Sequence, residues 1–418
     1  MSLSAMGVFP SGRIVLKMTL AVGLAGVVVS GVFWNRRSAV PLPEGIGAEQ
    51  YERAVRNFRR SQHRNPDSPD IYYRLGVDLS EDGDWSTAAA CFAAIPFDNS
   101  RYGQPATLKR AQALLQLSHL SEAERLISSF LDRESRSPSS AVTAEEIAAA
   151  KHCQSLILAL ELRFDERKIV LWNLIDRHEA DLHDTLAACF PTLMEWYSPD
   201  GARRIADACR ADRQNTGLRA TLVHYRLAQG RQDEAGALVA TLAGEAPDDP
   251  RVIAARLAVL YEAANWIALT REIEKLPQPR EADPPFILRV RGQVQLHDGN
   301  FEAAADCFRM VLAGDPANAE SHLGLARACS ARNLTEEQEQ HIAIARTLAR
   351  IQNRLGWATA ANATFEPLAE ITDLSWKIGL RRECRAVLDA ALRAFPDSAE
   401  LQKLQARRSA ESVELPVQ

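Results

Sequence analysis

Hydrophobic residues between Pro285 and Pro316 recur every three or four positions, which is the spacing of two short amphipathic helices. The first helix is expected over residues 286–297 and the second over residues 301–313. Gly299 separates them, because glycine adopts a positive φ without a steric penalty. Neither helix can bury its apolar face alone. The pattern therefore predicts a stack in which similar helix pairs lie on either side of this one.

The same arrangement of residues recurs elsewhere in a frame of 34 residues. Small residues stand at positions 8 and 20, where two helix backbones cross closely, and an aromatic residue stands at position 24. In the frames that start at Pro69 and Pro285, the matching residues are Gly76 and Gly292, Ala88 and Ala304, and Phe92 and Phe308. This pattern resembles the tetratricopeptide repeat, W-x2-L-G-x2-Y followed by A-x3-F and Pro. The resemblance implies an all-α fold, a right-handed superhelix (solenoid) of antiparallel helix pairs whose first helices line a concave groove.

The frame divides the chain into segments of different regularity. Thr143 and Glu146 have the spacing of a capping box, so a helix should begin there. The polar, serine-rich residues 132–141 should form a loop. We expect tetratricopeptide-like (TPR-like) repeats at residues 48–131 and 216–350. Degenerate helical repeats are expected at 143–210, and a degenerate repeat with a C-terminal capping helix at 357–409.

Residues 14–34 form a hydrophobic stretch that carries no charge from Met18 to Trp34. Its length suits one transmembrane helix, and it lies between an N-terminal tail, residues 1–13, and a Pro/Gly linker, residues 35–47. We therefore predict a single-pass membrane protein with an N-terminal anchor. Because basic residues flank the stretch on both sides, the side of the membrane that holds the body stays open. A cleaved signal segment is the alternative, and it would leave an exported soluble adaptor.

Composition narrows the partners that the chain can have. Hydrophobic residues make up 46% of the sequence, which is enough for a continuous core. The formal net charge of −5 argues against general affinity for nucleic acid, which requires a basic surface. The seven cysteines include no C-x2-C pair, so we interpret them as small buried residues of helices rather than as a disulfide or zinc framework.

The sequence contains no nucleotide-binding loop, no metalloprotease motif and no nucleophile elbow. His178 and His183 form the densest group of potential metal ligands, but their i, i+5 spacing does not place them on one helix face. We interpret that segment as a solvated helix junction. The chain is therefore predicted not to be an enzyme, with no metal, no cofactor and no small-molecule substrate. An enzyme with its site in the degenerate region 143–210 is the alternative.

In repeats of this type, side chains at positions 2, 5, 9, 12 and 13 point into the concave groove. Arg289, Gln293 and Arg327 could hold a carboxylate or an extended peptide there. The alternative is that they are ordinary solvated residues of a concave surface. The candidate groove residues are His224, Arg251, Tyr261, Arg289, Gln293, His297 and Arg327.

These observations predict a membrane-anchored scaffold for protein–protein interactions. One function that such a scaffold can have is that of an assembly factor. The partner would be a protein or an extended peptide, and the sequence does not identify it. The carboxylate-clamp repeats of the family carry Lys and Asn at positions 5 and 9. Here those positions hold Tyr73 and Val77, or Ala220 and His224, so capture of chaperone tails is not implied.

Overall fold

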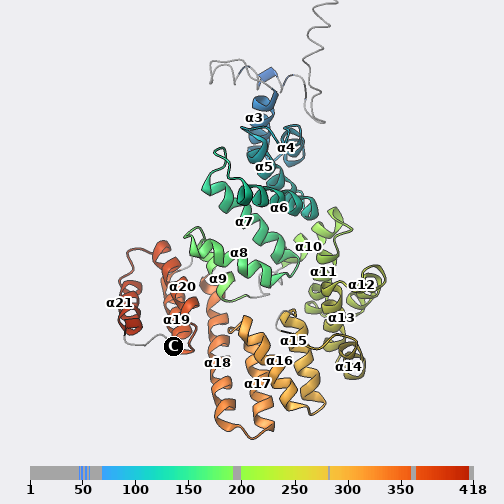
Figure 1. Cartoon of the computed structure of the whole chain (residues 1–418), viewed down its shortest axis with the longest axis vertical. Helices are drawn as coiled ribbons and strands as arrows, with labels where there is room; N and C mark the ends of the chain where they lie inside the picture. Colours follow the sequence, from blue (N-terminus) through green and yellow to red (C-terminus); the bar gives the residue numbers. More distant parts are fainter. Residues whose placement is uncertain are drawn as a thin grey trace, which may run out of the picture. The chain divides into compact units, whose positions relative to one another are not determined.

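The computed structural model describes residues 68–191, 199–280, 283–358 and 364–413, together with positions 47, 49, 52, 53 and 56. Within these residues the chain forms 19 helices, α3 to α21, and no strand (Figure 1). The predicted all-α solenoid is therefore confirmed. The transmembrane helix that was expected before it falls on residues 14–34, which lie outside the described residues.

Most of the helices pack against the helix that follows them in the sequence. The helices are α3 (Ser68–Glu81), α4 (Trp85–Ala93), α5 (Gly103–Gln116), α6 (Leu120–Arg136), α7 (Ala144–Leu160), α8 (Phe164–Asp176), α9 (Leu182–Cys189), α10 (Pro199–Ala211), α11 (Thr216–Ala228), α12 (Gln232–Glu245), α13 (Pro250–Glu262), α14 (Trp266–Glu274), α15 (Pro285–His297), α16 (Phe301–Gly314), α17 (Ala319–Ala331), α18 (Thr335–Ala358), α19 (Phe365–Lys377), α20 (Arg381–Ala394) and α21 (Ala399–Val413).

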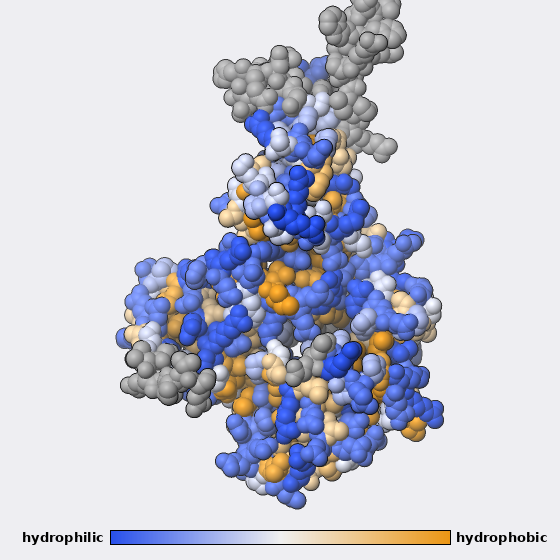
Figure 2. Space-filling model, viewed as in Figure 1, coloured by the Kyte–Doolittle hydropathy of each residue, from blue (hydrophilic) through white to orange (hydrophobic). Residues whose placement is uncertain are grey.

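Contacts divide the chain into two compact units, residues 1–106 and 107–418, and the boundary falls within α5. In the described part of the first unit, α3 packs on α4 through Tyr72 and Phe92, which are almost fully buried. In the second unit the buried apolar residues form successive clusters between neighbouring helices. Figure 2 shows that hydrophilic residues dominate the visible surface and that hydrophobic residues are exposed there only in separate groups.

The turn between paired helices has one backbone geometry throughout the stack. Gly299 has φ +82° there, and Gly83, Gly230 and Gly379 have φ between +70° and +84°. Leu162 has φ +57° in the corresponding turn between α7 and α8, although leucine rarely adopts this region. The degenerate segment therefore keeps the turn of the repeat without its glycine. The capping box predicted at the start of α7 is also present, with Thr143 and Glu146 bonded reciprocally.

Glycine at position 8 is required by an aromatic ring. A Cβ added to Gly292 would lie 2.7 Å from the ring of Phe308, and one added to Gly324 would lie 2.4 Å from the same ring. Phe308 has no exposed surface, so the ring cannot move aside without displacing its neighbours. Phe308, on α16, thus packs against both α15, the first helix of the same repeat, and α17, the first helix of the next repeat.

Gly292→Ala should lower the free energy of unfolding by about 1–3 kcal/mol, because the added methyl group overpacks the Phe308 contact. Gly236→Ala is the matched control. Gly236 lies within α12 and nothing would meet its Cβ within 4 Å, so this change should stabilise the helix by about 0.5–1 kcal/mol. Urea unfolding followed by circular dichroism measures both. A Gly292→Ala protein as stable as the wild type would contradict the packing described.

Unit 2 contains a contact between distant parts of the chain that the repeat pattern did not predict. Helix α9 packs against α20, and α7 contacts α11. Contacts therefore run without a break from α7 through α11, α13, α15, α17, α18, α19, α20, α9 and α8 back to α7. The helices of this unit form a closed ring of contacts, where the sequence predicted an open stack.

The closing contact is a full hydrophobic core. Its buried residues come from α8, α9, α18, α19, α20 and α21, and they include Leu171, Leu186 and Val387. Polar groups surround it: the Lys168 ammonium donates to the Gly314 carbonyl at 2.9 Å, and the Arg382 guanidinium lies 3.7 Å from the centre of the Trp172 ring. The core and the Arg382 contact hold α8 and α9 to the C-terminal helices, and the Lys168 contact holds α8 to the end of α16.

Leu186→Ala should weaken the closing core by about 2–5 kcal/mol, because it leaves a cavity at a site that is 3% exposed. We expect faster amide hydrogen exchange in α20 as well as in α9, although the two helices are far apart in the sequence. Leu242→Ala, an equally buried change in α12, should instead raise exchange around α11 to α13. Unchanged exchange in α20 of the Leu186→Ala protein would show that the contact does not form.

The localisation predicted from residues 14–34 requires correction. None of the helices in the described part of the chain is long and apolar enough to cross a membrane. On this finding the predicted single-pass membrane localisation is wrong, although residues 14–34 themselves lie outside the described residues. We withdraw it, together with the membrane as a partner of these residues.

Candidate partner-binding groove

Four first helices of consecutive repeats, α11, α13, α15 and α17, lie side by side in unit 2. Residues at positions 2, 5, 9, 12 and 13 of the frame recur at helical spacing, so they share one face of each helix. We call the surface that these positions form across the four helices the first-helix face. It is the surface on which the sequence places the candidate residues.

The centre of the first-helix face is an aromatic and charged cluster. The His224 ring from α11 meets the Phe286 ring from α15 edge to face, with ring centres 5.6 Å apart. The Arg289 guanidinium lies 5.3 Å from the centre of the Phe286 ring, and its Nη1 lies 2.7 Å from a carboxylate oxygen of Glu320 on α17. The small residues at positions 5 and 9 of α13, Ala254 and Ala258, leave room for this contact.

His224 is part of the packing of this cluster and carries no charge at neutral pH. Burial lowers the pKa of His224 to about 4, and the nearby Arg289 guanidinium acts in the same direction. The imidazole therefore offers a partner no cation.

An accessible strip borders this cluster on α15 and α17. Leu323 is 44% exposed, and Arg327 is exposed one helical turn further along α17. Gln293 is half-buried one turn beyond Arg289 on α15. We call Arg289, Gln293, Glu320, Leu323 and Arg327 the groove strip. It places an apolar side chain and a cation next to each other on an accessible surface.

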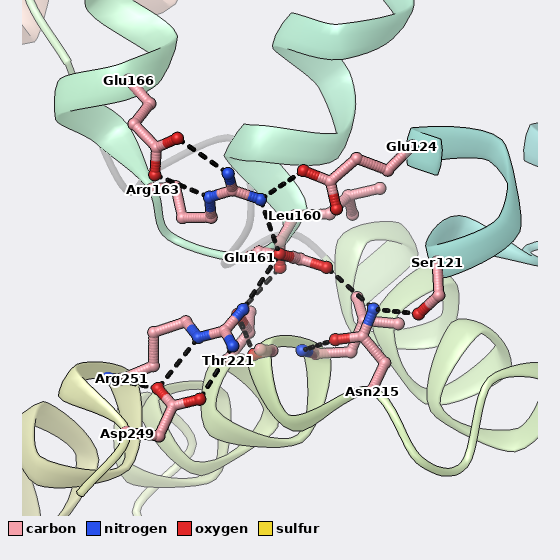
Figure 3. A network of polar contacts seen from close by, with 12 residues as sticks. Ser121, Glu124, Leu160, Glu161, Arg163, Glu166, Asn215, Thr221, Asp249 and Arg251 are labelled. Carbon is pink, nitrogen blue, oxygen red and sulfur yellow. Dashed lines mark hydrogen bonds and ion pairs between the residues drawn. The ribbon is translucent and has the colours of Figure 1, made fainter. Parts of the chain in front are cut away.

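Arg251, also predicted to line the groove, is bound within a polar network (Figure 3). Its guanidinium pairs with Asp249 at 2.8 Å and with Glu161 at 3.1 Å. Glu161 is only 3% exposed, and it also accepts from Asn215 at 2.8 Å and from Arg163 at 3.3 Å. A buried carboxylate requires such partners, because an unpaired buried charge is strongly destabilising. Arg251 thus joins α13 to the turn between α7 and α8.

Tyr261 and His297 both pack against Trp266. The His297 ring is stacked on the indole with centres 4.7 Å apart and planes 10° from parallel. The Tyr261 ring meets the same indole edge to face at 5.9 Å. These two candidates therefore belong to an aromatic stack at the ends of α13 and α15, and the contacts described do not join them to the groove strip.

Sequence reasoning passed over Phe286, Glu320 and Leu323, although the signal for them was present. Phe286 and Glu320 occupy position 2 of their frames and Leu323 occupies position 5, which are groove positions. Phe286 and Leu323 were not among the candidates because they are apolar, whereas most of the candidates were polar residues. Trp266 carried no such signal, because its contact with His297 depends on how two repeats pack.

The histidine-rich segment after α8 serves to begin and end helices. His178 has φ +60° in the turn that ends α8, and the Asp181 side chain accepts from the Asp184 backbone N–H at 2.7 Å to begin α9. Asp184 also pairs with His152 at 2.7 Å, and that hydrogen bond raises the pKa of His152. Across the described residues no group of three or more His, Cys, Asp or Glu side chains could hold a metal ion.

His224 should make stability depend on pH. The unfolded histidine takes up a proton near pH 6.5, whereas the folded one resists it down to about pH 4, so the unfolded state binds more protons between these values. The free energy of unfolding of the wild type should therefore fall by about 2–3 kcal/mol more than that of His224→Phe as the pH drops from 6.5 to 4. Urea unfolding at several pH values measures the difference. Parallel pH profiles for the two proteins would contradict the half-buried, neutral imidazole.

Parts of the chain are similar to a known protein family and to several solved structures. The family model described as "Tetratricopeptide repeat" matches residues 46–102 and 289–350. No curated protein matches the chain. Solved structures similar to it include a tetratricopeptide repeat protein from Parabacteroides merdae, at 12% identity over 62% of this chain and 98% of that one with a TM-score of 0.31. Yeast Tom70 has 10% identity over 87% and 92% of the two chains with a TM-score of 0.31. Pseudomonas aeruginosa pilF has 16% identity over 57% and 99%, with a TM-score of 0.29.

The family model matches two separate segments, and one of them spans the two glycines that enclose Phe308. Outside these segments, the positive φ turns at residues such as Gly230 and Gly379 continue the helix-pair architecture. Residues 46–102 and 289–350 are therefore tetratricopeptide repeats.

Proposed function

We propose that the chain is a scaffold for protein–protein interactions, and that the groove strip binds an extended segment of a partner protein. The observation that carries this proposal is the exposure of Leu323 beside Arg327 on α17. An exposed large apolar side chain next to a cation gives a partner both burial energy and charge recognition. Holding such a segment while other subunits bind is the role of an assembly factor, which is the role we propose.

The spacing of these two residues defines the segment that fits them. Leu323 and Arg327 are separated by one helical turn, a rise of about 6 Å. An extended peptide places every second side chain on the same face, about 6.5 Å apart. A segment with an apolar residue, then any residue, then an acidic residue therefore matches the strip. Its backbone would lie along α17.

Arg289 provides a second position for a carboxylate. It is paired with Glu320, whose side chain is 68% exposed. Exposed ion pairs contribute only about 0–1 kcal/mol, so a carboxylate of the partner can replace Glu320 at little cost. Gln293 lies one turn along α15 from Arg289 and can bond to the peptide backbone. The strip is thus suited to a segment with more than one acidic residue.

Selection from a random library of displayed nonapeptides tests the proposal. We expect the full chain to enrich peptides with an apolar-x-acidic spacing. Leu323→Asp combined with Arg327→Glu should weaken these peptides at least tenfold, because the apolar contact is lost and the cation is reversed. Fluorescence anisotropy with one selected peptide measures the affinity.

Ile267→Asp combined with Arg271→Glu is the matched control. These residues are also separated by one turn and exposed, but they lie on α14, a second helix, and the charge changes are identical. Binding should remain within twofold of wild type in this variant. Equal loss in both variants would mean that overall charge controls binding, and the groove strip would not be the site.

A further inference from the structure

Unit 2 also contains a pocket whose lining residues differ from those of the groove strip. Helices α10, α11 and α12 surround a pocket of about 680 Å³, which we call the α10–α12 pocket. This volume lies within the usual range of ligand sites, about 300–1,000 Å³. Its lining residues are Cys209, Arg213, Gln214, Arg219, Leu222, Leu238 and Glu245. None of them belongs to the groove strip or to the candidate residues of the sequence.

One part of the pocket wall is apolar. Leu222 of α11 and Leu238 of α12 are half-buried and face the hollow. Cys209 of α10 adds a thiol whose pKa burial raises to about 11, so it is protonated and uncharged at neutral pH. A short aliphatic side chain would bury apolar surface against these three residues.

Two guanidinium groups lie beside this apolar wall. The Arg219 side chain is only 17% exposed, and it binds the carboxylate of Glu245, whose side chain is 52% exposed. Arg213 is exposed at the pocket. The Glu245 pair shows that a carboxylate can bind at this edge. Two cations and one carboxylate leave the lining one positive charge, which suits a ligand with one negative charge.

Hydrogen bonds to Ser121 hold the loop that carries Arg213 in place. Asp212 accepts from the Ser121 backbone N–H at 2.8 Å, and Asn215 donates to the Ser121 hydroxyl at 3.0 Å. Asn215 also donates to the buried Glu161, within the network of Figure 3. Arg213 and its neighbour Gln214 therefore lie between two anchored residues. This preorganisation lowers the entropy lost when a ligand binds.

We propose that the α10–α12 pocket binds the C-terminal end of a partner polypeptide that finishes in an aliphatic residue. The terminal carboxylate binds Arg213 and Arg219, and the last side chain lies on Leu222 and Leu238. The argument is one of geometry and charge: a chain end carries its carboxylate and its last side chain on the same carbon, and the pocket places guanidinium groups beside an apolar wall. This site is independent of the groove strip.

The probe is the peptide Gly-Ser-Gly-Ala-Val-Leu with fluorescein at its N-terminus, prepared with a free C-terminal carboxylate or as the amide. Fluorescence anisotropy with the full chain should show saturable binding of the acid. The amide should bind at least tenfold more weakly, because it loses a charge-assisted contact. Arg213→Ala combined with Arg219→Ala should reduce binding of the acid to the level of the amide.

Two control variants distinguish the α10–α12 pocket from other cationic surfaces of the chain. Arg271→Ala combined with Lys275→Ala removes two exposed cations, one on α14 and one directly after it, and should leave binding of the acid within twofold. Leu323→Asp combined with Arg327→Glu, which tests the groove strip, should leave it unchanged too. Loss in the groove-strip variant alone would move the site to the groove and overturn this proposal.

Three further results would contradict the proposal. The first is equal affinity for acid and amide, and the second is no saturable binding of the acid at millimolar concentration. The third is displacement of the peptide by sodium octanoate at the same concentration as by unlabelled peptide, which would show a site for small carboxylic acids rather than for chain ends. Failure of octanoate to compete supports the polypeptide end.

Discussion

The contact between α8–α9 and α18–α21 determines how unit 2 is organised. A helix pair of this kind leaves apolar surface exposed on both sides, and in an open stack the two ends would each need a polar cap. Here α8 and α9, which leave the stack after α7, meet the C-terminal helices instead. Leu171 and Leu186 are buried with Leu368 and Val387, so these two parts of the chain cover each other's apolar surface. Every first helix between α11 and α17 is thereby held in a closed cycle of contacts.

The carboxylate of Glu161 is a second contact that holds the ring together. It lies at the turn after α7, where the chain leaves the stack to form α8 and α9, and it binds Asn215 at the start of α11 and Arg251 at the start of α13. The network thus joins the turn after α7 to the first helices α11 and α13. The network also contacts both proposed binding surfaces: it holds the loop beside the α10–α12 pocket, and through Arg251 it holds α13, one of the four helices of the first-helix face.

The sequence predicted local structure well because local structure depends on local residues. Gly299 and the capping box at Thr143 indicated where helices end and begin, and the spacing of Gly292 and Phe308 indicated the repeat. The positive φ of Leu162 could not be predicted, since the surrounding packing imposes it. Ring closure has no periodic signal either, because it depends on complementary surfaces far apart in the chain. The same limit applies to the candidate site: frame positions identified Arg289 and Arg327, but only the packing shows that Arg251 serves Glu161.

Zero-length cross-linking with a carbodiimide tests the closed ring most directly. The Lys168 ammonium lies 3.7 Å from the Asp315 carboxylate, across residues that only ring closure brings together. We expect the monomeric chain to yield a Lys168–Asp315 amide, identified by mass spectrometry as a linked peptide pair that has lost one water. The local pair Lys377 and Asp373, 2.7 Å apart within α19, calibrates the yield. Formation of the local link without any Lys168–Asp315 link would contradict a closed ring.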